Sequence, residues 1–421
     1  MIMKLSQTRG CNRLRSFDAV TIMICICIRS ATAAAFHYYR PNLPNLLPCR
    51  TAVQNNGFAS YCTLPYVTVL NNSRDRNSET ENSNESPIRK ARLVFLGTPD
   101  VAASSLQSLV KASQEAEACF DIVGVVTQPP KRRKRNAAAE PSPVQKVAED
   151  YGIHVLSPEQ AKDPEFLEEL ENTFQPDICI TAAYGQYLPK RFLAVPKLGT
   201  INIHPSLLPR WRGASPVQRS LEAGDDIIGV SILYTVSKMD AGPIIFQDTY
   251  KVGINEQSKA VLQKLFEVGT ESLIKLLPSV VSGKITFDTA TPQNEDGVVK
   301  ADMIDVAEGE LEVWKESAAV AHNKVRGFSI WPGTWIYFNI GIDSQEPVRI
   351  KIIQTKVREE KLAPTRTVEL GKNRGDGLLV ICADGSVLEL LQVQPETKKV
   401  MDAKSFVNGL RDKTLEWVEM P

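Results

Sequence analysis

The chain has 421 residues, with 49 basic and 49 acidic side chains and 43% hydrophobic residues. This length corresponds to two or three domains of ordinary size, and the hydrophobic fraction is too high for a wholly disordered chain. A net charge of zero excludes a globally basic nucleic-acid coat protein, although it leaves room for a local basic patch. The sequence contains no run of 18 apolar residues, so we expect no membrane span.

The N-terminal segment is rich in arginine and poor in acidic residues. Residues 1–70 carry seven basic side chains, and Asp18 is their only acidic one. This composition is typical of a transit peptide, so we predict one over 1–70 and a mitochondrial location, with the plastid as the other possible destination. Residues 71–90 are polar and lack aromatic side chains, which predicts a disordered linker. For residues 1–70, an ordinary disordered tail is the alternative to a transit peptide.

Cysteine usage favours neither a zinc site nor a disulfide framework. Five of the eight cysteines lie within the first 62 residues, and the other three are far apart along the chain. None of them forms a C-x-x-C pair, the usual spacing of cysteine zinc ligands. We therefore predict no metal site.

From Ala91 onward, short apolar runs alternate with helical patterns. The apolar runs predict strands at 92–97, 121–127, 177–183, 199–203 and 227–235. The patterns between them predict helices at 99–113, 142–151, 165–174 and 215–223, and a long closing helix at 256–277. This alternation predicts a Rossmann-like α/β domain over 91–290, with a parallel sheet and helices on both faces. The first turn has one glycine rather than three, which argues against a dinucleotide site.

The pattern changes after a linker that we predict at 291–306. One amphipathic helix is expected at 314–325, and apolar runs predict strands at 334–338, 348–353, 367–370, 378–382 and 387–393. Five short strands separated by turn residues favour a small OB-like (oligonucleotide-binding) β-barrel over 307–421. Any other compact β domain is the alternative.

Three polar residues are candidates for chemistry. Asn202 and His204 end a predicted strand with a period-two spacing that points both to one side, and Asp240 follows the strand at 227–235. Ligands of open α/β sheets bind at the carboxyl ends of strands. A histidine base, a carboxylate that orients it and an amide donor for an oxyanion suit acyl transfer to an amine. Taken singly, each residue is more often structural: a core histidine, a turn-forming asparagine and a solvated aspartate.

The stretch 199–214 resembles the formyltetrahydrofolate-dependent formyltransferases. Motifs similar to those of this family recur at 95–100, 125–129, 141–144, 183–185, 207–219, 239–242 and 331–333. The resemblance therefore spans about residues 91–415. Leu208-Pro-Arg-Trp-Arg-Gly-Ala214 and the Trp-Pro pair at 331–332 are most similar to the members that formylate methionyl-tRNA.

The resemblance implies specific roles. It implies a catalytic triple of Asn202, His204 and Asp240. The residues that it implies as folate contacts are Ser206, Leu207, Leu208, Pro209, Tyr184 and Gly185. The implied reaction moves a formyl group from 10-formyltetrahydrofolate to the α-amine of initiator methionyl-tRNA, catalysed by a monomer without a metal ion. Alternatives are a formyltransferase that acts on an amino-sugar or ribonucleotide amine, and a non-catalytic relative that binds RNA or folate.

A basic run follows the motif at 125–129. The family has here a loop rich in Arg, Gly and Lys that contacts the tRNA acceptor end, and this sequence keeps the charge without the glycines. We expect Arg132, Arg133, Lys134 and Arg135 to bind tRNA phosphates in a salt-dependent way. Consecutive cations alone are more typical of a solvated, nonspecific run. The C-terminal barrel would add a second, tethered tRNA contact.

Overall fold

The computed structural model describes residues 89–132, 138–341, 346–411 and 413–420. The predicted transit peptide over 1–70, most of the predicted linker over 71–90, and Arg133, Lys134 and Arg135 lie outside the described residues. No helix in the described ranges is long and apolar enough to cross a membrane. The same ranges contain no group of three or more His, Cys, Asp or Glu side chains arranged to hold a metal ion.

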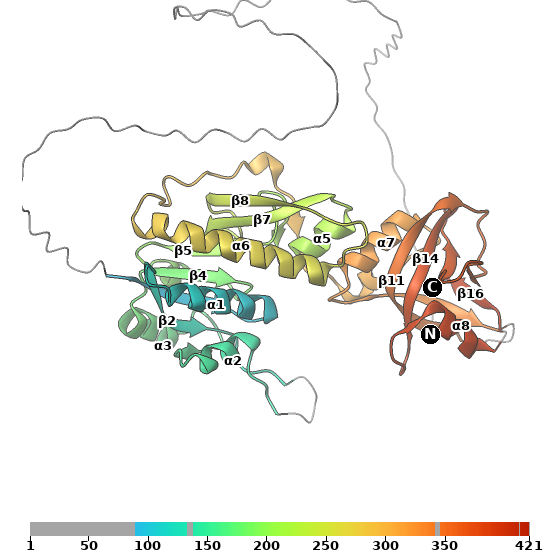
Figure 1. The fold of residues 1–421 in the computed structure, drawn as a ribbon, viewed down its shortest axis with the longest axis horizontal. Coiled ribbons are helices and arrows are strands. Elements are labelled where there is room, and N and C mark those ends of the chain that lie inside the picture. Colours follow the sequence, from blue (N-terminus) through green and yellow to red (C-terminus); the bar gives the residue numbers. More distant parts are fainter. Residues whose placement is uncertain (1–88, 133–137, 342–345, 412, 421) are drawn as a thin grey trace, which may run out of the picture. The chain divides into compact units, whose positions relative to one another are not determined.

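A seven-stranded sheet forms the centre of the first domain (Figure 1). Its strands, in the order in which they lie side by side, are β3 (Val155–Leu156), β2 (Phe120–Val126), β1 (Ala91–Gly97), β4 (Ile178–Ala182), β5 (Thr200–His204), β7 (Ile227–Tyr234) and β8 (Ile244–Lys251). The first five pair in parallel, which confirms the α/β prediction. The sheet is thus mostly parallel, but β7 pairs antiparallel with β5 and with β8, a strand that the sequence patterns did not predict. The short connection at 235–243 can join β7 and β8 only as antiparallel neighbours.

Helices cover both faces of this sheet and create two hydrophobic clusters. The helical elements are α1 (Asp100–Ser113), α2 (Pro143–Asp150), α3 (Pro164–Glu169), the π-helical turn η1 (Leu170–Phe174), α4 (Lys190–Leu193), α5 (Pro216–Glu222) and α6 (Ser258–Val281). In β1, Leu93 and Phe95 enter one cluster, whereas Val94 and Leu96 enter the other. Burial on both faces explains why this strand reads as a continuous apolar run.

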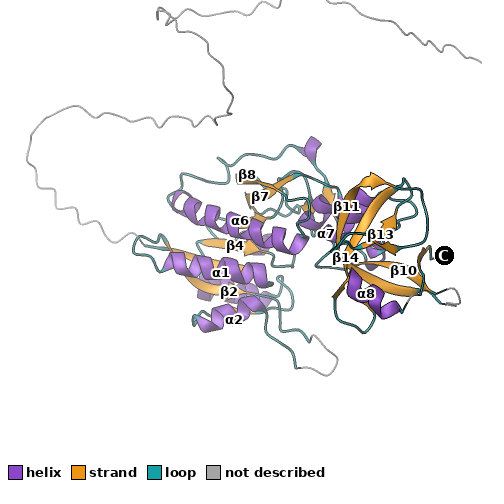
Figure 2. Cartoon of the chain, turned by 45° about the vertical axis from the view of Figure 1, so that its right-hand side comes forward, coloured by secondary structure: helices purple, strands orange, loops and turns teal. Residues whose placement is uncertain are grey.

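The second domain is an antiparallel β-barrel (Figure 2). Its strands, in spatial order, are β12 (Glu369–Leu370), β13 (Leu378–Ile381), β14 (Ser386–Pro395), β11 (Val348–Lys361), β10 (Thr334–Ile340) and β16 (Leu415–Val418), with β15 (Met401–Asp402) paired to β14. The barrel closes where Val368 N donates to Leu415 O at 2.8 Å and Trp417 N donates to Arg366 O at 3.0 Å. These bonds confirm the prediction of a small barrel. Helices α7 (Ala318–Gly327) and α8 (Ala403–Leu410) accompany it.

The predicted linker at 291–306 contains regular structure of its own. It includes one 3-10 turn, η2 (Glu295–Gly297), and a short strand, β9 (Lys300–Ala301), and a second 3-10 turn, η3 (Val306–Gly309), begins at its last residue. β9 pairs in parallel with β6 (Arg212–Gly213), which directly follows the motif predicted to bind folate. The segment thus lies against the first domain near its candidate site.

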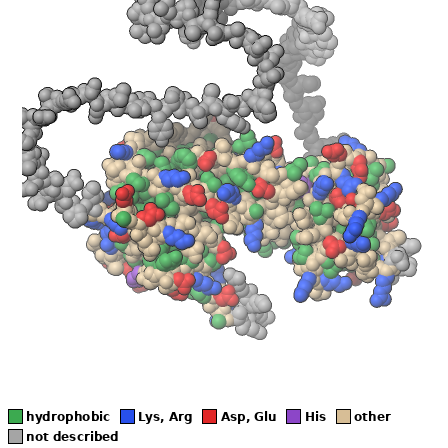
Figure 3. Space-filling view, viewed as in Figure 1, with side chains coloured by type: hydrophobic (Ala, Val, Ile, Leu, Met, Phe, Trp, Pro, Cys, Tyr) green, Lys and Arg blue, Asp and Glu red, His purple; other side chains and the backbone are tan. Residues whose placement is uncertain are grey.

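The surface carries charges of both signs. In the view of Figure 3, acidic and basic side chains are interspersed over the first domain rather than separated into one basic face. This distribution agrees with the zero net charge of the sequence. A tRNA contact would therefore rest on local groups of cations, as the sequence predicts for the segment that begins at Lys131.

Candidate active site

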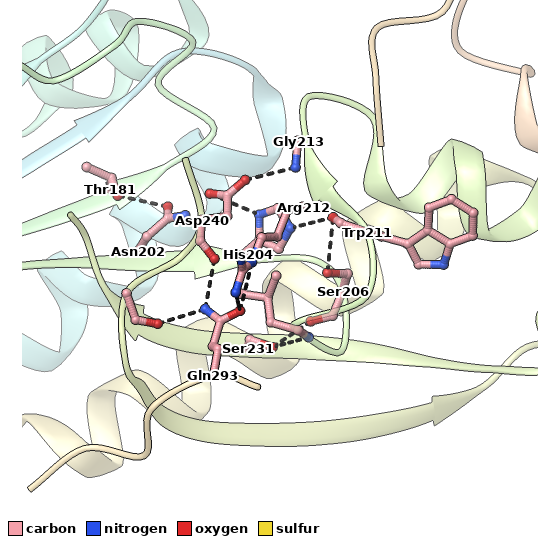
Figure 4. A network of polar contacts seen from close by, with 12 residues as sticks. Thr181, Asn202, His204, Ser206, Trp211, Arg212, Gly213, Ser231, Asp240 and Gln293 are labelled. Carbon is pink, nitrogen blue, oxygen red and sulfur yellow. Dashed lines mark hydrogen bonds and ion pairs between the residues drawn. The ribbon is translucent and has the colours of Figure 1, made fainter. Parts of the chain in front are cut away.

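The carboxyl end of β5 presents two polar side chains on one side of the sheet. Ile201 and Ile203 point into a hydrophobic cluster and are fully buried. The alternation of a strand therefore turns Asn202 and His204 to the opposite side. Figure 4 shows both beside Asp240, which lies on the loop between β7 and β8. The structure thus brings together the three residues that the resemblance assigns to catalysis.

His204 is only 4% exposed and has two different neighbours. Its Nε2 lies 3.0 Å from the carbonyl oxygen of Trp211. A carbonyl can only accept, so Nε2 carries the proton and Nδ1 of the neutral ring is an acceptor. Nδ1 lies 3.7 Å from Oδ1 of Asp240. This distance is within ion-pair range but too long for a hydrogen bond, and catalytic hydrogen bonds commonly shorten when substrate binds.

The carboxylate of Asp240 is held on its other side by the backbone. Its Oδ2 accepts a hydrogen bond from Gly213 N at 3.0 Å. Gly213 has φ +135°, and a Cβ there would lie 2.4 Å from the carbonyl oxygen of Ala301, so only glycine fits. The two oxygens therefore have separate tasks: one is anchored to β6 and the other faces the imidazole.

Asn202 has its amide oriented by Thr181. The Thr181 hydroxyl donates to Oδ1 of Asn202 at 2.8 Å. This bond fixes which end of the amide is the oxygen and leaves the amide N–H groups to donate elsewhere. Among the described residues, no hydrogen bond uses them. Asn202 thus offers a donor of the type that stabilises a developing oxyanion.

The loop Ser206–Pro209, predicted to contact folate, is held by its neighbours. Ser231 donates through Oγ to Ser206 O at 2.6 Å and accepts from Leu208 N at 3.1 Å. Gln247 donates to Leu208 O at 3.0 Å. These bonds fix the backbone of the loop, which forms one wall of the site and carries apolar side chains at Leu207, Leu208 and Pro209.

Tyr184 and Gly185 lie in different surroundings. The Tyr184 ring is buried in the second hydrophobic cluster, and this burial raises the pKa of its phenol. Its carbonyl accepts hydrogen bonds from Thr98 and Gln128. Gly185 has φ +84° and borders a hollow of about 670 Å³ together with Gln128, Lys131 and Tyr187. A ligand in this hollow would meet Gly185 and not the Tyr184 ring.

The basic loop begins at the same hollow. Lys131 and Glu140 exchange two backbone hydrogen bonds of 3.1 Å, which close the base of the loop. Lys131 lines the hollow, and Arg132 next to it is exposed. Lys131, directly before the predicted tRNA-binding residues, therefore borders the same hollow as Gly185.

Two further residues at the site were not assigned a role from the sequence. Arg212 is a buried cation, 6% exposed, whose Nε and Nη2 donate to Oε1 of Gln293 at 3.0 and 2.8 Å. Gln293 in turn donates to the carbonyl oxygens of Asp240 and Gly242. Arg212 also forms an ion pair with Glu295. Hydrogen bonds from Lys238 and, to a smaller extent, from Arg212 lower the pKa of the Glu295 carboxyl. Arg212 lies in the family-like motif at 207–219, but its separation from Gln293 in the sequence gives no sign of their contact.

Comparisons with known proteins identify the families to which the two domains are similar. Residues 91–277 match the family model described as formyl transferase, and residues 303–411 match the formyl transferase C-terminal domain. Among solved structures, the sugar 3N-formyl transferase WlaRD, determined in the presence of dTDP and 5-N-formyl-THF, has a TM-score of 0.53 at 17% identity, over 74% of this chain and 100% of that one. An N-formyltransferase from Helicobacter canadensis has a TM-score of 0.52 at 16% identity, over 72% and 99%. These likenesses concern the fold.

Similarity in sequence is more specific. Methionyl-tRNA formyltransferase of Myxococcus xanthus is 35% identical over 325 residues, which are 76% of this chain and 96% of the relative. The enzyme of the same name from Caulobacter vibrioides is 36% identical over 318 residues, with the same two shares. The chain therefore belongs to the methionyl-tRNA formyltransferase family of enzymes.

Proposed function

We propose that the protein transfers the formyl group of 10-formyltetrahydrofolate to the α-amine of methionine on initiator tRNA, and that it does so for translation initiation in an organelle. The observation that carries the reaction is the arrangement at the end of β5, where Nδ1 of His204 faces Asp240 beside the amide of Asn202. The acceptor is supported by the relatives, which are named methionyl-tRNA formyltransferases and cover both domains.

Each of the three residues has a distinct task in this reaction. His204 accepts a proton from the attacking amine at Nδ1, because Nε2 already donates to Trp211. Asp240 stabilises the resulting imidazolium and keeps the ring oriented. Asn202 donates to the formyl oxygen as it gains negative charge. No Ser or Cys nucleophile is required, because the amine attacks directly.

The surrounding residues fit a folate donor. The loop Ser206–Pro209 carries apolar side chains at three of its four positions. The amide of Asn202 has an unused donor on the side of β5 that also carries His204. A bound folate would supply the formyl carbon: the amine adds to it first, and the bond from that carbon to N10 then breaks as N10 receives a proton. The chain positions this exchange, and His204 returns the proton that it took from the amine.

The location and the assembly state are part of the proposal. The seven basic residues and single acidic residue of 1–70 support an organelle transit peptide, with the mitochondrion as the destination and the plastid as the alternative. We expect a monomer. Import of the full chain into isolated mitochondria and chloroplasts, followed by protease treatment, tests the destination. If neither organelle protects the chain from the protease, the proposed organelle location is contradicted. Light scattering of the imported, processed protein tests the monomer.

One assay separates the candidate functions. The protein is incubated with 10-formyltetrahydrofolate and Met-charged initiator tRNA, and the aminoacyl product is analysed after release from the tRNA. We expect formylmethionine at a rate far above that for an amino sugar nucleotide or glycinamide ribonucleotide. Equal rates with a small amine would identify a different acceptor, and tRNA binding without transfer would identify a non-catalytic protein.

A further inference from the structure

The segment that joins the two domains is built into the catalytic site. Thr291 exchanges backbone hydrogen bonds of 2.7 and 2.9 Å with Ile244, at the start of β8. Farther along, Gly297 lies against the side chain of Pro209, so that a Cβ at this glycine would be 3.1 Å from Pro209 Cγ. β9 then pairs with β6, whose Gly213 anchors Asp240. The segment therefore contacts the wall of the site at three successive points.

Gln293 is the residue of this segment that reaches the catalytic loop. Its Nε2 donates to Asp240 O at 2.8 Å and to Gly242 O at 2.7 Å. Its Oε1 accepts two hydrogen bonds from Arg212. All four hydrogen-bonding positions of the amide are thus used. A flipped amide would point donors at donors and an acceptor at acceptors, so this orientation is fixed (Figure 4).

The loop that Gln293 holds has a conformation that is costly without support. Asp240 has φ +48°, in the left-handed region that residues other than glycine rarely adopt. Gly242 is so close to β7 that a Cβ there would lie 1.7 Å from Tyr234 O. Strained backbone of this kind persists where its surroundings over-determine it. The two bonds from Gln293, one on each side of Ala241, provide that constraint.

We propose that Gln293 is a positioning residue that sets the place of the Asp240 carboxylate relative to His204. The proposal rests on the proposed function for the reaction that it assists. Buried Arg212 holds the oxygen end of Gln293, and Glu295 holds Arg212 through a hydrogen bond of 3.1 Å. The connection between the domains thereby becomes part of the active site rather than a spacer.

Two substitutions distinguish positioning from space filling. Gln293→Glu keeps the size of the side chain and an oxygen for Arg212, but it places a carboxylate oxygen against two carbonyl oxygens. Gln293→Ala removes all four bonds. We expect kcat to fall about 10- to 100-fold in both, the usual effect of losing a residue that orients a catalytic group, while KM for tRNA and for folate stays within about twofold. If Gln293 only fills space, Gln293→Glu should keep the wild-type kcat.

Gln257→Ala is the matched control. The amide of Gln257 also donates to a backbone carbonyl at 2.7 Å, that of Ile353, but it does not contact the catalytic loop. We expect this variant to keep the wild-type kcat. A fall in kcat equal to that of Gln293→Ala would show that any lost glutamine bond has the same effect.

Hydrogen exchange tests the proposal without relying on activity. In Gln293→Ala, the backbone amides of residues 238–242 should exchange faster than in the wild type, while those of α1 stay unchanged. Unchanged exchange at 238–242 would overturn the proposal even if the protein formylates tRNA. Faster exchange in a protein that is inactive on tRNA would support the role of Gln293 and reject the proposed function separately.

Discussion

His204, the proposed base, and His322 are both buried histidines, but their rings have different partners. The two are buried to nearly the same extent, 4% and 5% exposed, and each donates from Nε2 to a backbone carbonyl, of Trp211 and Ile254 respectively. The other nitrogen differs. Nδ1 of His204 faces the carboxylate of Asp240, whereas Nδ1 of His322 accepts from the Thr355 hydroxyl at 2.8 Å. A hydroxyl satisfies a neutral ring, and a carboxylate stabilises the protonated ring that a base becomes. The partner of the second nitrogen, and not burial, therefore distinguishes the proposed base from the other buried ring.

The largest expected effect comes from His204→Ala. We expect kcat to fall about 10³-fold, within the range of a lost general base, with little change in far-UV circular dichroism. His322→Ala, which removes an equally buried ring, should lower the melting temperature and keep kcat within about tenfold of wild type. Steady-state kinetics and thermal unfolding of both variants check this. Comparable loss of kcat in the two variants would remove the distinction between them.

Asn202→Ala should have the next largest effect. Loss of one oxyanion donor lowers kcat about 10²- to 10³-fold in comparable sites. Thr181→Val removes only the bond that orients the Asn202 amide, so we expect a smaller fall in kcat. Single-turnover measurements that start from the complex of the protein with both substrates isolate the chemical step. If Thr181→Val is as damaging as Asn202→Ala, the hydroxyl has a role beyond orientation.

The sequence predicted most of the fold because most elements have strong local patterns. β1 is buried on both faces and reads as an apolar run, but β8, at the edge of the sheet, is largely exposed and has no such signal. Asn202 and His204 could be found because two positions on one strand share a side. Gln293 could not, since it contacts Asp240 across 53 residues and no periodic pattern connects segments so far apart. The transit peptide over 1–70 and its destination stay predictions.

The same comparison of interaction partners can be made for the cations of β11. At one end of this strand, Arg358 pairs with Glu360, Asp376 and Glu389. At the other end, Lys351 lies opposite Trp335 and Gln394, and it forms no ion pair with any described residue. A cation without a carboxylate partner is available to a phosphate, so Lys351 is a candidate contact for tRNA.

Lys351→Ala should therefore raise the KM for methionyl-tRNA about 3- to 10-fold and reduce the steepness of its salt dependence by roughly one phosphate contact. Arg358→Ala should leave both unchanged and lower stability instead. Kinetics at several salt concentrations check this pair of variants. An equal rise in KM for the two variants would show that the lack of an ion pair does not determine which of these cations contacts tRNA.

The smallest expected effect is a pH dependence of stability that originates at His322. Burial, with a smaller contribution from Arg326, lowers the pKa of His322 below the ordinary value of about 6.5. The unfolded chain therefore takes up a proton there at higher pH than the folded protein does. The stabilisation is complete above about pH 6.5 and is lost as pH falls from that value toward the lowered pKa of the folded state. In His322→Gln, whose amide stays neutral, the free energy of unfolding should decrease less between pH 7.5 and 5.5 than in wild type. Denaturant titrations at each pH measure this, with the exposed His154→Gln as the control variant; equal pH dependence in His322→Gln and wild type would locate the titrating group elsewhere.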